Sequence, residues 1–163
     1  MPKRVFSQTF GVVAGLLVKD GKFLLVREAR RKGPDHGKWN HPAGWIEVGE
    51  NPLSGVKREV LEESGYAFEP THILGIYSLV RSDIAREVGG TPHAIKVVFL
   101  GKISENPAGD LHDDVSETRW FTREEIKAMD GSELRDVDIK QMVDDYFEGR
   151  AIPLNRLIHT IQT

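Results

Sequence analysis

The stretch GWIEVGENPLSGVKREVLEESGY, residues 44–66, gathers Glu59, Glu62 and Glu63 within five positions. Its spacing becomes helical from about residue 52, where Pro52 fits a first helical turn, and Gly65 supplies a helix end. Like charges three and four residues apart on a helix repel, and each such pair costs about a few tenths of a kcal/mol. The stretch therefore predicts a helix at 52–64 whose clustered negative charges lower the stability of the helix.

The predicted helix has an acidic face and an apolar face. At about 100° per residue, Gly55 and the three glutamates share one face, and an adjoining stripe carries Leu53, Val56 and Val60. The stripe can pack on a sheet, which would hold the acidic face in place. Carboxylates held in this way suit Mg²⁺, which prefers oxygen ligands and commonly bridges one or two carboxylates to substrate phosphates. The alternative interpretation is a solvated, charged helix face.

The whole stretch resembles the signature of the Nudix hydrolase family, without a gap. That signature runs Gly, five residues, Glu, seven residues, Arg-Glu-aliphatic, one residue, Glu-Glu, one residue, Gly and a closing apolar residue. The matching positions are Gly44, Glu50, Arg58-Glu59-Val60, Glu62-Glu63 and Gly65, with Tyr66 in the place that an aliphatic residue usually holds. Flanking features agree with the family: a hairpin pattern before the box, WNHPAG leading into it, and a WF pair before a later helix.

The resemblance implies an α+β fold, in which a mixed sheet is packed between helices as an α/β/α sandwich. It also implies roles for the box residues. Glu59 and Glu63 are expected to be metal ligands, and Glu62 is expected to be a third ligand or a base. Arg58 is expected to orient the glutamates through a charge-assisted hydrogen bond.

Three further positions complete the implied site. Glu50 is expected to support the loop or a second metal from the edge, and the backbone carbonyl of Ala43 is expected to be a metal ligand. In LHDDVSETRWF, residues 111–121, Asp114 best matches a further catalytic carboxylate, although Glu is more usual at that position. Exposed loop acids are the alternative interpretation of this segment. The implied cofactor is Mg²⁺, with Mn²⁺ as a substitute.

The implied activity is hydrolysis of a pyrophosphate bond in a nucleoside diphosphate linked to another group, with water attacking phosphorus. A metal held on the glutamate face would acidify a bound water and clamp the substrate phosphates. The alternative is a domain of the same family that senses a nucleotide without hydrolysing it, although such domains usually have a broken box. A Nudix-fold isomerase would need acid and base residues that the sequence gives no reason to assign.

The substrate is indicated only by short matches. No proline lies between Pro70 and Pro92, which lowers the case for ADP-ribose, because related enzymes often carry a proline about fifteen residues beyond the box. The WNHPAG segment resembles a branch that includes bacterial phosphatases of nucleoside triphosphates and thiamine-pyrimidine pyrophosphate. The sequence therefore favours a small nucleoside triphosphate or a pyrimidine pyrophosphate as substrate.

Candidate substrate contacts lie on both sides of the box. Trp39 either stacks on a substrate ring or belongs to the core, which is the commoner role of an aromatic at a strand edge. Arg27 and Lys38 are candidates for phosphate contacts. The polar loop at 82–92 is a candidate to frame the substrate, and four charged residues surround it: Arg81, Arg86, His93 and Lys96. For most of these charged residues, solvated surface charge is the favoured interpretation.

Other segments predict the remaining elements. Residues 12–18 and 22–27 form alternating apolar runs around a Lys-Asp-Gly turn, which indicates a hairpin and argues against an export signal at the N-terminus. Strands are expected at 72–81, 93–103 and 117–122. A helix should begin at Thr122, because Thr122 and Glu125 have the spacing of a capping box, and a second helix is expected at 132–147.

The composition sets outer bounds. With 163 residues the chain has the length of one domain, 1–163, and its net charge of −3 offers no electrostatic footprint for nucleic acid or an anionic membrane. The absence of cysteine excludes disulfides and thiolate chemistry, and it suits the cytoplasm. We therefore expect a small-molecule substrate as the partner.

The C-terminal tail, residues 150–163, carries an apolar pattern of its own. Leu154, Leu157, Ile158 and Ile161 sit at i, i+3, i+4 and i+7, which predicts one face of a short helix. Such a stripe seldom stays in water. It either packs on its own domain or covers a second subunit, which would make a homodimer.

Overall fold

The computed structural model describes residues 9–29 and 33–163. In chain order the elements are β1 (Thr9–Gly15), β2 (Val18–Lys19), β3 (Lys22–Glu28), β4 (Trp39–Asn40), β5 (Ala43–Trp45), α1 (Pro52–Ser64), β6 (Phe68–Val80), the 3₁₀ turn η1 (Ser82–Ile84), α2 (Ala85–Val88), β7 (His93–Ile103), β8 (Val115–Phe121), α3 (Arg123–Ala128), α4 (Ile139–Phe147), β9 (Ile152–Pro153) and the 3₁₀ turn η2 (Leu154–Arg156). The sequence argued against an export signal at the N-terminus. Residues 1–8, where such a signal would begin, lie outside the described residues. Among those that are described, no helix is long and apolar enough to cross a membrane.

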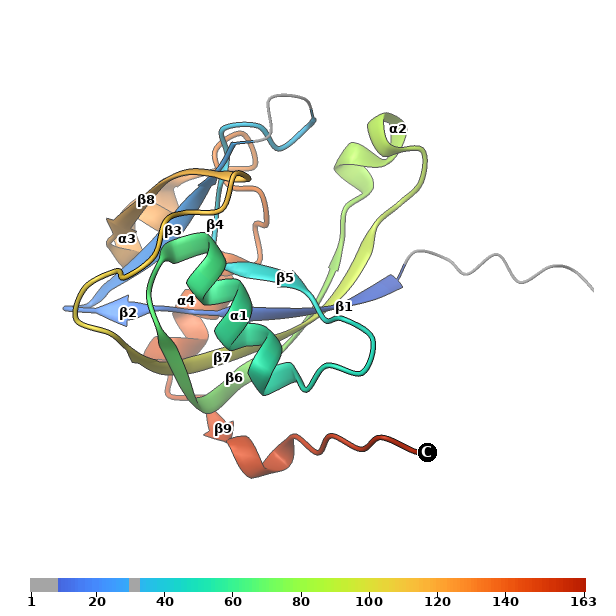
Figure 1. Cartoon of the computed structure of the whole chain (residues 1–163). Coiled ribbons are helices and arrows are strands. Elements are labelled where there is room, and N and C mark those ends of the chain that lie inside the picture. The colour runs from blue at the N-terminus through green and yellow to red at the C-terminus, as the bar shows by residue number, and fades with distance from the viewer. Residues whose placement is uncertain (1–8, 30–32) are drawn as a thin grey trace, which may run out of the picture.

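Helices cover both faces of the strands, as Figure 1 shows with α1 in front and α4 behind. The reason is the alternation of side chains along the strands. Val13 and Leu24 face the core that contains α1, whereas their neighbours Ala14 and Leu25 face the core that contains α3 and α4. β1 and β3 are therefore apolar on both sides, and the expected α+β sandwich with helices on two faces is confirmed.

The strands form two sheets. The larger has the order β5-β1-β7-β6-β9, with β1 and β7 parallel and the other neighbours antiparallel. The smaller has the order β2-β3-β4, and β8 also pairs with β3. The larger sheet contains both parallel and antiparallel pairs, so it is the mixed sheet that the resemblance implied.

The expected hairpin between residues 12–18 and 22–27 is wrong for most of its length. Only Val18 and Lys19 pair with β3, while the preceding residues of β1 pair with β5 and β7 in the other sheet. Leu16 and Leu17 explain the break, because one enters each hydrophobic core where the chain passes from one sheet to the next. An apolar run that looks like one strand in the sequence thus serves two sheets.

Helix α1 lies where the sequence predicted it. Asn51 caps its start by accepting a hydrogen bond from the Leu53 N–H at 2.9 Å, and Val56 and Val60 are fully buried. Gly65 ends it in the left-handed conformation, with φ of 74°. A Cβ at this position would also lie 2.8 Å from the Gly109 carbonyl oxygen, so the helix end needs glycine for two reasons.

A loop at residues 104–114 closes over the C-terminal end of α1. The backbone N–H of Ala108 donates to the Gly65 carbonyl at 2.8 Å, and that of His112 donates to the Glu62 carbonyl at 2.8 Å. Carbonyls at the end of a helix have no partner within the helix. This loop supplies partners for two of them.

The later elements differ more from expectation. The capping box of Thr122 and Glu125 is confirmed, with both of its hydrogen bonds formed. The second helix starts at Ile139 rather than at residue 132, because residues 131–138 form turns. The predicted C-terminal helix is wrong: after the short β9 and η2 the chain runs on without regular structure, and Ile158 and Ile161 are exposed.

Candidate functional site

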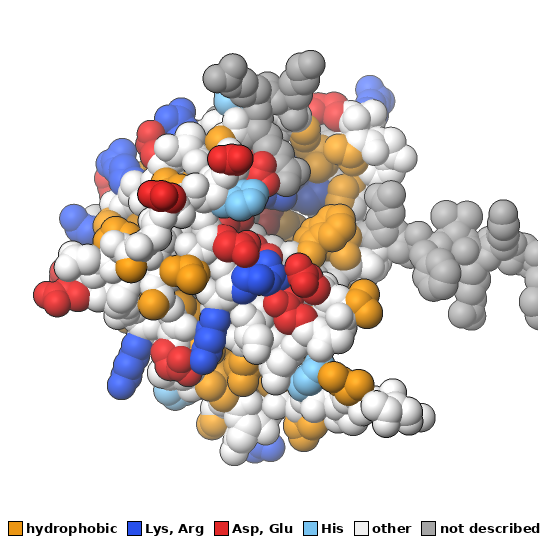
Figure 2. All heavy atoms as spheres, in the orientation of Figure 1, with side chains coloured by type: hydrophobic (Ala, Val, Ile, Leu, Met, Phe, Trp, Pro, Cys, Tyr) orange, Lys and Arg blue, Asp and Glu red, His pale blue; other side chains and the backbone are white. Residues whose placement is uncertain are grey.

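The acidic face of α1 is organised around one arginine. The Arg58 guanidinium donates to both carboxylate oxygens of Glu50, at 2.9 and 3.0 Å, and also donates to Glu59. It lies 3.5 Å from the Glu62 carboxylate as well. Figure 2 shows acidic side chains gathered around a basic one over this helix. The positive charge of Arg58 offsets the predicted repulsion between the glutamates, and three carboxylates lie close to it.

Two residues of β5 lie against this face. The Ala43 N–H donates to the Glu63 carboxylate at 2.9 Å. At Gly44 an added Cβ would lie 2.0 Å from the Glu59 carboxyl carbon, so only glycine lets that carboxylate rest on the strand. The strand and the helix thereby fix Glu59 and Glu63 in relation to the Ala43 backbone.

The carboxylates on this face differ in their protonation. Burial raises the pKa of Glu63 to about 8, although the Ala43 N–H opposes the shift. Burial also raises the pKa of Glu59, against the influence of Arg58. The hydrogen bond from Arg58 lowers the pKa of Glu50. Glu63 and Glu59 are thus carboxylates whose negative charge lacks solvation, which is the condition that a bound cation relieves.

These residues fit a divalent metal ion by their chemistry. Glu59, Glu62 and Glu63 offer oxygen donors on one helix face, and the Ala43 residue beside them offers a backbone carbonyl. Their ligand oxygen atoms are not all within 4.8 Å of one another. Arg58 donates to Glu59, and the Ala43 N–H donates to Glu63. Among the described residues, the set that meets this distance is His41, Asp136 and Asp138.

The set around His41 is already neutralised by a lysine. The Lys96 Nζ lies 3.0 Å from an Asp136 oxygen and 2.7 Å from an Asp138 oxygen, in the position that a cation would take. Burial raises the pKa of Asp136, but Lys96 and other nearby cations outweigh it and hold that pKa at about 2. We therefore interpret this group as an internal ion-pair network, and we place the candidate metal site at the glutamates.

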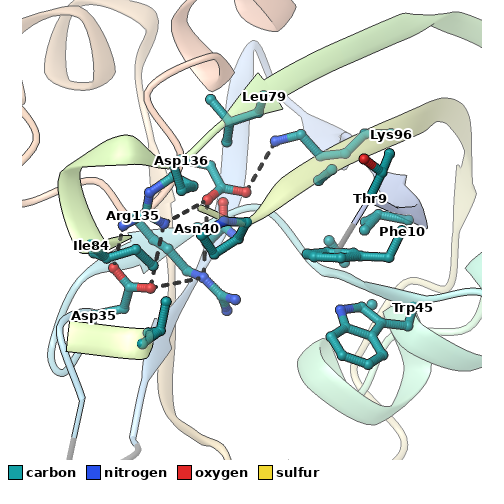
Figure 3. A pocket seen from close by; sticks show the side chains of 17 residues that line it. Thr9, Phe10, Asp35, Asn40, Trp45, Leu79, Ile84, Lys96, Arg135 and Asp136 are labelled. Atoms are coloured by element: carbon teal, nitrogen blue, oxygen red, sulfur yellow. Dashed lines mark hydrogen bonds and ion pairs between the residues drawn. The ribbon is translucent and has the colours of Figure 1, made fainter. Parts of the chain in front are cut away.

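A cavity of about 490 Å³ opens beside β5. Ala43, Gly44 and Trp45 form part of its wall. The remaining described lining residues come from β1, from β4, from the ends of β6 and β7 with the segment between them, and from the loops before β4 and before α4: Thr9, Phe10, Val12, Asp35, Asn40, Leu79, Arg81, Ile84, Val88, Pro92, Ala94, Lys96, Arg135 and Asp136. Figure 3 shows Phe10 and Trp45 on one side of this cavity, and Asp35, Arg135 and Asp136 on the other.

Charged groups on the inner wall are paired with one another. Arg81 lies 2.8 Å from Asp35 and 3.3 Å from Asp136, and the side chains of Arg81 and Lys96 are 10% and 1% exposed. The favoured interpretation of solvated surface charge therefore does not hold for Arg81 and Lys96. They lie inside the protein, where each carries a carboxylate partner.

The structure brings some predicted residues to the site and leaves others apart. Glu50, Arg58 and the three glutamates share one face, and the loop that carries Asp114 reaches the end of α1 through the His112 N–H. The predicted substrate contacts do not line the cavity. Trp39 packs edge-on against Phe121, Arg27 donates to the Gly37 carbonyl at 3.0 Å, and Lys38 lies 3.7 Å from Asp35.

Sequence reasoning missed the cavity residues Trp45, Arg135 and Asp136. Trp45 lies inside the Nudix box. No local sequence pattern indicates that its side chain is 66% exposed and lies next to Phe10. For Lys96 a signal existed, because Ala94, Lys96 and Val98 alternate along one face of a strand, and Val98 is core. A lysine in a core-facing register indicates a buried ion pair.

Comparisons with known proteins identify the family. The sequence model of the NUDIX domain matches residues 8–141. Phosphatase NudJ of Escherichia coli K12 is 29% identical over 148 residues, which are 89% of this chain and 88% of that protein. A NUDIX hydrolase from Nitrosomonas europaea superposes with a TM-score of 0.78 and 32% identity, over 93% of this chain and 97% of that one. A MutT NUDIX hydrolase from Burkholderia pseudomallei gives 0.61 and 26%, over 73% and 87%. With an intact box on α1 and a match across most of its length, the chain belongs to the Nudix hydrolase family.

Proposed function

We propose that this Nudix hydrolase cleaves the pyrophosphate bond of a small nucleotide or a related small molecule, using Mg²⁺ held by Glu59, Glu62, Glu63 and the Ala43 carbonyl. One observation carries the proposal. Ala43 and Gly44 form part of the cavity wall and also contact the carboxylates of Glu63 and Glu59. A substrate in the cavity would therefore have its phosphates beside the glutamate face.

The chain's own residues have separate roles in the proposed hydrolysis. A divalent ion held by these carboxylates would acidify a water molecule and offset the charge of the phosphate oxygens. Arg58 holds Glu59 and Glu50 in place by charge-assisted hydrogen bonds. Glu62 has a side chain that is 44% exposed, so it would either complete the ligands of the ion or take a proton from water. Asp114, on the loop docked at the same helix end, is the second candidate base.

The inner part of the cavity suits an uncharged group. Its buried cations Arg81 and Lys96 already have carboxylate partners, so they are not available to a further phosphate. Phe10 and Trp45, with ring centroids 4.9 Å apart, offer an apolar surface at the opposite side. The volume of about 490 Å³ suits one small molecule. These features support a nucleoside triphosphate or a pyrimidine pyrophosphate over a dinucleoside polyphosphate.

A substrate panel tests the activity. The purified protein is incubated with Mg²⁺ or Mn²⁺ and with nucleoside triphosphates, nucleotide sugars, dinucleoside polyphosphates and pyrimidine pyrophosphates, and released phosphate or pyrophosphate is measured. We expect metal-dependent release from at least one of the small substrates. A ligand that raises the melting temperature while no product forms would instead support a nucleotide sensor.

Variants test the assignment of the metal ligands. Glu63→Gln should lower turnover by orders of magnitude and leave the circular dichroism spectrum unchanged. Glu124→Gln, which removes an exposed carboxylate on α3, is the matched control and should behave as the wild type. Turnover at the wild-type rate in Glu63→Gln would contradict the assignment.

We further propose that the exposed isoleucines of the tail contact a second subunit in a cytoplasmic homodimer. Ile158 is 85% exposed and Ile161 is 65% exposed, whereas Leu154 and Leu157 pack on the chain's own core. The double change Ile158→Asp and Ile161→Asp should convert a dimer to a monomer by light scattering. A wild type that is monomeric at micromolar concentration contradicts the dimer.

A further inference from the structure

Three cations line the cavity among the described residues, and one of them differs from the other two. Arg81 and Lys96 have side chains that are 10% and 1% exposed. Arg135 has a side chain that is 40% exposed. A substrate that enters the cavity can therefore reach Arg135 directly, whereas the other two cations are enclosed by their carboxylate partners.

Arg135 is held in place from two sides. Its backbone N–H donates to the Trp39 carbonyl at 2.9 Å, which ties the segment before α4 to β4. Its side chain donates to the Glu28 carboxylate at 2.9 Å, and its Nε lies 3.5 Å from an oxygen of Asp35. A guanidinium has five N–H donors in a planar fork, so these contacts leave donors for a ligand.

The position of Arg135 joins the two parts of the site. It lines the same cavity as Ala43 and Gly44, which contact the glutamate face. Figure 3 shows it across the cavity from Phe10 and Trp45.

We propose that Arg135 binds a non-bridging oxygen of the substrate's pyrophosphate and so orients the remainder of the substrate into the cavity. The proposal rests on the proposed function, because it assumes a pyrophosphate at the glutamate face. Guanidinium groups bind phosphate oxygens through two parallel N–H donors, which fixes direction as well as position. Arg135 is thus a substrate-binding residue that lies outside the Nudix box.

Imidodiphosphate, a pyrophosphate analogue with a nitrogen bridge, tests the proposal without requiring turnover. Its affinity is measured by calorimetry with Mg²⁺ at constant ionic strength for the wild type, Arg135→Gln and Arg135→Lys. Arg135→Gln should weaken binding about tenfold or more, and Arg135→Lys should recover part of the loss. Arg123→Gln is the matched control, because Arg123 is 41% exposed, pairs with Asp144 and lies outside the cavity. It should bind as the wild type does.

Kinetics with the substrate found in the panel distinguish a phosphate contact of Arg135 from a purely structural role of this residue. A phosphate contact predicts a raised KM in Arg135→Gln. If Arg135 only holds Glu28 and Asp35, then KM and imidodiphosphate affinity stay at wild-type values while the melting temperature falls, and the proposal is overturned. A wild type that binds imidodiphosphate but hydrolyses nothing contradicts the proposed function alone, since the affinity comparison still decides the role of Arg135.

A second measurement needs no variant. Phenylglyoxal modifies accessible arginines, and mass spectrometry of peptides reports which ones react. Imidodiphosphate with Mg²⁺ should protect Arg135 in the wild type and leave the modification of Arg123 unchanged. Equal modification of Arg135 with and without the analogue would overturn the proposal, whatever the stability of the variants.

Discussion

Replacing His41 by leucine should remove a large part of the acid sensitivity of this protein. His41 is fully buried, and neither ring nitrogen has a hydrogen-bond partner of good geometry among the described residues. Burial, with a smaller contribution from the Lys96 ammonium, lowers the pKa of His41 from its ordinary value of 6.5 to about 3. Asp136 and Arg135 also act on the ring, in opposite directions. The folded protein therefore keeps this imidazole neutral at pH values where the unfolded chain protonates it.

The sign and size of the effect follow from proton linkage. Between about pH 6.5 and pH 3 the unfolded state binds more protons at this site, so the free energy of unfolding falls as the pH falls. Between about pH 8 and pH 5 the expected loss is about 2 kcal/mol for this one group. Above about pH 8 the site contributes almost no pH dependence, because the imidazole is then neutral in both states.

Urea unfolding at about pH 8 and pH 5, with EDTA present, measures the effect. The wild type should lose about 2 kcal/mol more than His41→Leu between these two conditions. Glu63, whose pKa burial raises to about 8, titrates in the same window, but it is present in both proteins and cancels in the difference. His72→Leu, at an exposed histidine, controls for the loss of a histidine as such. An equal loss in the wild type and His41→Leu would refute the reasoning.

Three further substitutions test single features of the fold and the site. Lys96→Met leaves two buried carboxylates without their cation, and it should lower the free energy of unfolding by about 3 kcal/mol or more, measured in urea. Gly44→Ala places a Cβ 2.0 Å from the Glu59 carboxyl carbon and should lower turnover on the order of 100-fold in a metal-dependent assay; unchanged turnover would show that Glu59 need not rest on the strand. Gly65→Ala forces a left-handed alanine against the Gly109 carbonyl and should cost about 1–2 kcal/mol of stability, so a melting temperature equal to the wild type would contradict the role given to this helix end.

The sequence predicted α1 well because its signals are local. Asn51 and Pro52 start the helix and Gly65 ends it, all within one turn of the helix itself. The same holds for α3, where Thr122 and Glu125 form both bonds of the capping box. The glutamate face follows directly from the helix, because its residues are three and four positions apart.

The cavity could not be predicted in the same way, because its charged pairs join distant parts of the chain. Lys96 and Asp136 are 40 positions apart, and Arg135 and Glu28 are 107 positions apart. No local pattern links such residues. Only the packing of β7 against the segment before α4 brings Lys96 and Asp136 together, and this packing converts apparent surface charges into an internal network.

In the tail, tertiary contacts prevent the helix that the local spacing of apolar residues predicts. The spacing of Leu154, Leu157, Ile158 and Ile161 fits a helix. In the structure Ile152 and Pro153 pair with β6, and Leu154 and Leu157 pack on the core beside α1. Those contacts hold the chain in a strand and a single 3₁₀ turn, which a continuous helix could not satisfy.

The loop at residues 104–114 determines how rigid the acidic face can be. Helix ends fray, and the glutamates at 62 and 63 sit in the last turn of α1, which would be the first part of an isolated helix to open. The His112 N–H holds the Glu62 carbonyl and the Ala108 N–H holds the Gly65 carbonyl, so this turn opens only if the loop detaches. The positions of the Glu62 and Glu63 carboxylates thus depend on a segment about forty-five residues further along the chain.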